Sequence, residues 1–105
     1  MLQFNPTKNW YKRLAAMTES NEHGYRLQEI ALNCKEEADL QGDFLAREAF
    51  NAYYLEFREI IIEHEKARSL TYRLYIRRNA LADAMMREIR ETFGPEVERK
   101  IHATG

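Results

Sequence analysis

Histidines and glutamates are the side chains of this sequence that could perform acid–base or metal chemistry. The histidines are His23, His64 and His102. None has a glutamate three residues before it, as a helical di-iron site requires, and none belongs to the HExxH zinc pattern. A row of glutamates follows one flank of a predicted helix, at Glu56, Glu59 and Glu63. A pair of carboxylates acts as general acid and base only in a cleft that excludes water and separates their pKa values. A row of glutamates along a helix is more commonly exposed to water, so we do not expect this row to be catalytic.

The sequence also contains no motif typical of nucleophilic catalysis or of cofactor binding. The single cysteine, Cys34, excludes a disulfide within the chain and a cysteine-based zinc site. Because Cys34 recurs at helical spacing with the apolar residues Leu27, Ile30, Ala31 and Ala38, we expect it to be buried. The sequence contains neither a glycine-rich phosphate loop nor a nucleophile elbow. We therefore predict that the protein is not an enzyme and has no cofactor or metal site.

A basic stretch without any acidic residue lies between Glu65 and Asp83. Its cations are Lys66, Arg68, Arg73, Arg77 and Arg78, with Tyr72 and Tyr75 interleaved. Guanidinium groups pair with phosphates and tyrosines stack on bases, so one hypothesis is binding of a nucleic acid or another polyanion. The other interpretation, which the balanced total charge favours, is that arginines of this stretch pair with the glutamate row of a neighbouring helix.

Apolar residues on the outer sides of two predicted helices indicate a protein partner. Phe44, Leu55 and Ile62 lie nearly opposite the main apolar face of one helix, and Tyr72 and Ile76 lie on the polar side of the next. One layer of helices cannot bury both faces of each helix. Either the terminal segments cover these residues, with Trp10 and Tyr11 as candidates, or another chain does.

Arg78 is the unusual cation, because it falls inside the apolar arc of its helix. Its side chain either extends outward to water or meets a carboxylate at an interface, where arginine is enriched. The predicted partner-binding residues are Leu55, Ile62, Tyr72, Ile76 and Arg78.

Composition and charge fit a single small domain. The 105 residues are 45 % apolar, enough for a core, and only four glycines and two prolines disfavour an all-β chain. The formal net charge of −1 is the sum of two opposite charges, because residues 1–65 carry a net charge of −5 and residues 66–105 a net charge of +4. The two halves can neutralise each other within one chain or across a dimer.

Apolar spacing predicts an all-α domain over residues 1–105. The predicted helices are 8–19, capped by Thr7; a second from about 22 or 25 to 41; then 44–66, 70–93 and 95–103. Gly42-Asp43 and Gly94-Pro95 are typical helix boundaries, and Ser69 is the expected N-cap after the third helix. We expect an antiparallel bundle of three long helices with a short helix at each end.

The sequence therefore predicts a small protein-binding module of adaptor, chaperone or inhibitor type that forms a homodimer, with polyanion binding as the alternative. No stretch of 18 apolar residues occurs, and the beginning lacks the pattern of a secretory signal. We accordingly expect a cytoplasmic protein without a membrane partner.

Overall fold

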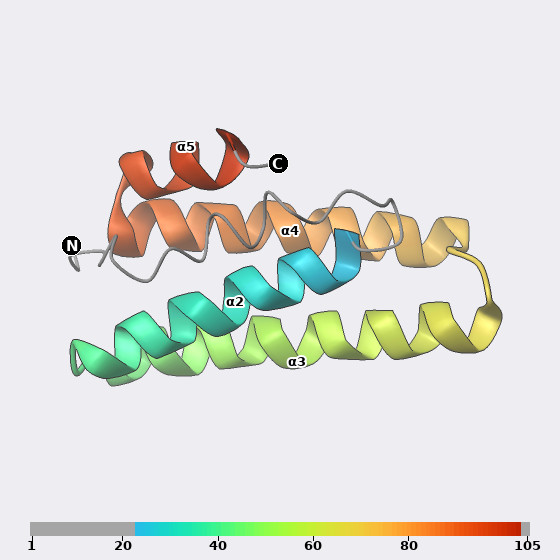
Figure 1. The fold of residues 1–105 in the computed structure, drawn as a ribbon, viewed down its shortest axis with the longest axis horizontal. Helices are drawn as coiled ribbons and strands as arrows, with labels where there is room; N and C mark the ends of the chain where they lie inside the picture. Colours follow the sequence, from blue (N-terminus) through green and yellow to red (C-terminus); the bar gives the residue numbers. More distant parts are fainter. Residues whose placement is uncertain (1–22, 104–105) are drawn as a thin grey trace.

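The structure, a computed structural model, describes residues 23–103, and this part of the chain is helical without any strand (Figure 1). The helices are α2 (His23–Leu40), α3 (Phe44–Ala67), α4 (Tyr72–Phe93) and α5 (Pro95–Ala103). The all-α class is thereby confirmed, and the packing of the helices is consistent with a bundle. The predicted helix 8–19, its cap Thr7 and the covering residues Trp10 and Tyr11 lie outside the described residues.

The turn between α2 and α3 follows from Gly42 and Asp43. Gly42 has φ +74°, in the left-handed region, and its N–H donates to the Asp39 carbonyl while the Asp43 N–H donates to the Ala38 carbonyl. These two bonds form a Schellman motif, which ends a helix at a left-handed residue. The Asp43 carboxylate then accepts a hydrogen bond from the Ala46 N–H at 3.0 Å and caps α3. The predicted boundary is confirmed.

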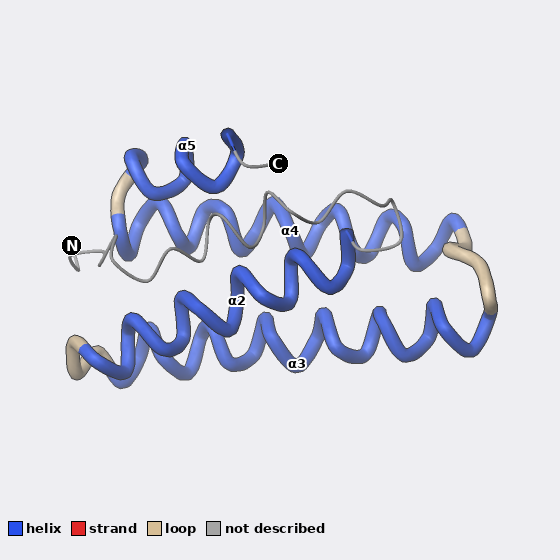
Figure 2. The backbone as a smooth tube through the Cα atoms, in the orientation of Figure 1, coloured by secondary structure: helices blue, strands red, loops and turns tan. Residues whose placement is uncertain are grey.

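The break between α3 and α4 is present, but its predicted cap was wrong. Arg68 ends α3 in the left-handed region, with φ 55°, and its N–H donates to the Glu65 carbonyl. The chain reverses direction after Arg68, so Ser69 and Leu70 lie in the connection (Figure 2). Thr71 caps α4 instead, because its hydroxyl is the one that accepts from the Leu74 N–H, at 3.3 Å.

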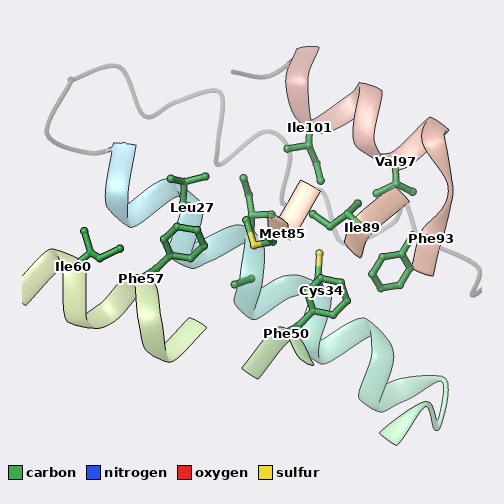
Figure 3. Packing of buried hydrophobic residues seen from close by; sticks show 12 residues of the cluster. Leu27, Cys34, Phe50, Phe57, Ile60, Met85, Ile89, Phe93, Val97 and Ile101 are labelled. Carbon is green, nitrogen blue, oxygen red and sulfur yellow. The ribbon is translucent and has the colours of Figure 1, made fainter. Parts of the chain in front are cut away.

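One apolar core joins the four helices (Figure 3). Phe50 and Phe57 of α3 are fully buried, and Phe50 stacks on Phe93 of α4 with the ring centroids 5.7 Å apart. From α2, the predicted apolar face is buried in full: Leu27, Ile30, Ala31, Cys34 and Ala38. Helix α5 folds back on α4 and adds Val97 and Ile101 to the core.

A bidentate ion pair reinforces the corner between α4 and α5. The Arg90 guanidinium donates to both carboxylate oxygens of Glu98, at 2.7 and 3.1 Å. The paired carboxylate raises the pKa of Arg90. Gly94, with φ +103°, ends α4 just before α5 begins.

Candidate functional site

The exposed apolar residues predicted to bind a partner lie on α3 and α4. Leu55 and Ile62 on α3, and Tyr72 and Ile76 on α4, are between 40 and 78 % exposed. Their exposure agrees with the expectation that the core cannot use both sides of these helices. We call these four residues the outer apolar set.

A groove between α3 and α4, which we call the outer groove, places one member of this set, Ile62, beside charged residues. The groove has a volume of about 470 Å³ and contains Ile62 and Leu74. Its α3 wall bears Glu59 and Glu63, while its α4 wall bears Arg73 and Arg77. Arg77 and Glu59 form an ion pair across the groove, at 3.0 Å. The predicted pairing of the two charged rows is therefore confirmed for this pair.

Arg78 lies elsewhere, in a smaller pocket on the inner side of α4. Only 9 % of Arg78 is exposed, so most of the side chain is buried and little of it reaches water. Its guanidinium lies over the ring of Tyr75, with Cζ 5.7 Å from the centroid, and its Nε is buried without a hydrogen-bond partner. Burial lowers the pKa of Arg78. No carboxylate within residues 23–103 forms an ion pair with it.

The pocket of Arg78, of about 200 Å³, lies where the beginning of α2 meets the end of α3. Buried Ile60 and Ile61 form apolar walls, and half-buried His64 joins them. At the exposed rim, the Tyr25 hydroxyl donates a hydrogen bond to the Glu65 carboxylate, which raises the pKa of Tyr25. We call this site the Arg78 pocket; its complete lining is Gly24, Tyr25, Ile60, Ile61, His64, Glu65, Arg68, Leu70 and Arg78.

The structure divides the predicted polyanion-binding residues between different places. Arg73 and Arg77 line the outer groove, Arg68 and Arg78 line the Arg78 pocket, and Lys66 is exposed at the end of α3. The five cations therefore do not form one continuous face that could follow a phosphate backbone. Sequence spacing did not indicate the Arg78 pocket, because Tyr25 and Glu65 are forty positions apart.

Two other reactive groups of the described chain, His23 and Cys34, lie on α2. His23, at the start of α2, has its pKa lowered by partial burial and by the positive charges of Arg78 and Arg26. Cys34 is fully buried, as predicted, and burial next to Glu37 holds its pKa far above the usual range. Within residues 23–103, no three histidine, cysteine or carboxylate side chains converge as metal ligands would.

Comparison of the chain with protein-family models, with curated proteins and with solved structures finds no match. Of the described helices, none is both long and apolar enough to span a membrane. The functional assignment therefore depends on the two sites described above.

Proposed function

We propose that this protein is a small protein-binding module that acts as a homodimer through the outer sides of α3 and α4. The observation that carries the proposal is the outer apolar set: four large apolar side chains that the described part of the chain leaves exposed, all on two helices. Exposed apolar side chains in this number are typical of protein interfaces, where aromatic and arginine side chains contribute most of the binding energy.

Charge complementarity favours a second copy as the occupant. Next to Leu55 and Ile62, α3 presents the glutamate row, while α4 presents Arg73 beside Tyr72 and Ile76. In a dimer with a two-fold axis, α3 of each protomer can lie along α4 of its partner. The contact between the glutamates of α3 and the arginine of α4 then occurs twice. This arrangement also buries the outer apolar set of both protomers. Arg73 forms no ion pair within residues 23–103, so it is available to such a contact.

The proposed module is a single domain in which α2, α3 and α4 form an antiparallel bundle. The connection between α2 and α3 is residues 41–43 and that between α3 and α4 is residues 68–71. Connections this short favour antiparallel neighbours. A cytoplasmic location and the choice among adaptor, chaperone and inhibitor remain predictions from the sequence.

Sedimentation velocity of the full chain tests the dimer. We expect a concentration-dependent dimer that the substitutions Leu55→Glu and Ile76→Glu each convert to a folded monomer, because both bury a charge in the interface. Leu40→Glu is the matched control, since Leu40 is an exposed leucine at the end of α2, outside the proposed face. A protein that sediments as a monomer at all concentrations, or glutamate variants that remain dimeric, would contradict the proposal.

Binding of a nucleic acid or another polyanion remains the alternative prediction, and the geometry supports it less well. Arg78 is buried and Arg77 is paired with Glu59, which leaves Lys66, Arg68 and Arg73 as the exposed cations of that set without a carboxylate partner in the described chain. Phosphate backbones are bound by continuous rows of exposed cations, so this distribution does not favour the alternative.

A further inference from the structure

The Arg78 pocket combines a buried cation with apolar walls. Arg78 is more than nine-tenths buried and lines the pocket, and it forms neither a hydrogen bond nor an ion pair with any residue of 23–103. Its guanidinium lies over the Tyr75 ring, with Cζ 5.7 Å from the centroid. The positive charge is thus held at the pocket, with Nε buried and unpaired and the other N–H groups without a partner in the described chain.

A buried guanidinium without a carboxylate is costly, because it loses water and gains little in exchange. Arginine presents five N–H donors in a planar fork that fits a carboxylate or phosphate in a bidentate way. An oxyanion that enters the pocket therefore supplies the interactions that the fold leaves unmade. Arg68 at the rim adds a second positive charge on the approach to Arg78.

The walls favour a carboxylate over a phosphate. Ile60, Ile61 and Leu70 line the pocket with apolar groups, and the Glu65 carboxylate at the rim repels an anion with two negative charges about twice as strongly as an anion with one. A volume of about 200 Å³ is below that of pockets for drug-sized molecules, which begin at about 300 Å³. These features select an acid with one negative charge and a short apolar tail.

We infer that the Arg78 pocket is a binding site for a small organic monocarboxylic acid, whose carboxylate pairs with Arg78 and whose tail contacts Ile60, Ile61 and Leu70. The site is separate from the outer apolar set, because none of its four residues lines the Arg78 pocket. Dimerisation and acid binding can consequently be tested independently.

NMR titration of the isotopically labelled full chain with butyrate tests this inference at constant ionic strength. We expect saturable shifts confined to the pocket, including the amide signals of Ile61 and Leu70. Butyramide, a neutral molecule of the same shape, should give no saturable shift, and orthophosphate should not displace butyrate. Arg78→Met should weaken butyrate binding about tenfold to a hundredfold, as expected for loss of a charge-assisted hydrogen bond. Arg77→Met, the matched control in the outer groove, should leave it unchanged.

Several results would overturn the inference. They are no saturable shift up to about 50 mM butyrate, equal binding of butyramide, preferential binding of orthophosphate, or butyrate binding that Arg78→Met does not weaken. A fifth is conversion of a dimer to a monomer by Arg78→Met, because an acidic side chain of a second copy would then be the group that pairs with Arg78.

Discussion

Replacing Arg78 by methionine should make the ligand-free protein more stable, although it removes the most unusual cation of the fold. Arg78 is buried, its Nε has no hydrogen-bond partner, and no carboxylate of the described chain pairs with it. Relief of one buried unsatisfied donor is worth about 1–3 kcal/mol. Loss of the cation–π contact costs about 0.5–1 kcal/mol, the range for exposed sites, because 46 % of Tyr75 is exposed. Methionine retains the apolar stem of the side chain, so packing changes little.

The net expectation is a gain of about 1 kcal/mol in the free energy of unfolding, equivalent to a rise of about 4–8 °C in Tm for a domain of this size. Urea denaturation and thermal unfolding measured by circular dichroism provide the assay. Arg77→Met is the control, because it removes an exposed ion pair with Glu59 and should cost about 0–1 kcal/mol. The two variants remove the same chemical group from adjacent positions and should change stability in opposite directions.

A loss of stability in Arg78→Met would refute this reasoning. Removing one member of a buried ion pair costs about 3–5 kcal/mol, so a decrease of that size would mean that a carboxylate satisfies Arg78 in solution. The same result would remove the main argument for an acid in the Arg78 pocket.

Two further predictions concern the core. Phe50→Ala should lower the free energy of unfolding by about 3–5 kcal/mol, because Phe50 is fully buried against Phe93, whereas Phe44→Ala at an exposed position should cost less than about 1 kcal/mol. Urea titrations compare the two, and similar losses would contradict the packing described here. Cys34 should resist an aromatic disulfide reagent at pH 8 until urea unfolds the protein, since burial raises its pKa and excludes the reagent. Immediate stoichiometric labelling of the native protein would show that α2 is not packed as described.

Local signals in the sequence were sufficient to predict most helix boundaries. Gly42-Asp43 and Gly94-Pro95 act through short-range effects, namely a left-handed glycine and a residue that caps or starts the next helix. The boundary after α3 was less accurate because the residue that ends it is Arg68, which has no intrinsic preference for the left-handed region. Both Ser69 and Thr71 can cap a helix, and only the path of the reversing chain decides between them.

The candidate sites were predictable to different degrees. Helical periodicity predicted that Leu55, Ile62, Tyr72 and Ile76 lie outside the core, and all four are exposed. Periodicity also placed Arg78 within an apolar arc, but it left open whether this arginine meets water or a carboxylate. The Arg78 pocket itself could not be predicted, because it joins Tyr25, Glu65 and Arg78 from three helices.

Spacing along the chain specifies which face of each helix is apolar, because that property depends only on the repeat of 3.6 residues per turn. It therefore predicted the all-α class, the core face of α2 and the burial of Cys34. The partners of a side chain depend on how helices approach one another, which is a property of the packed core. Only the tertiary structure paired Arg77 with Glu59 while it left its neighbour Arg78 buried without a carboxylate.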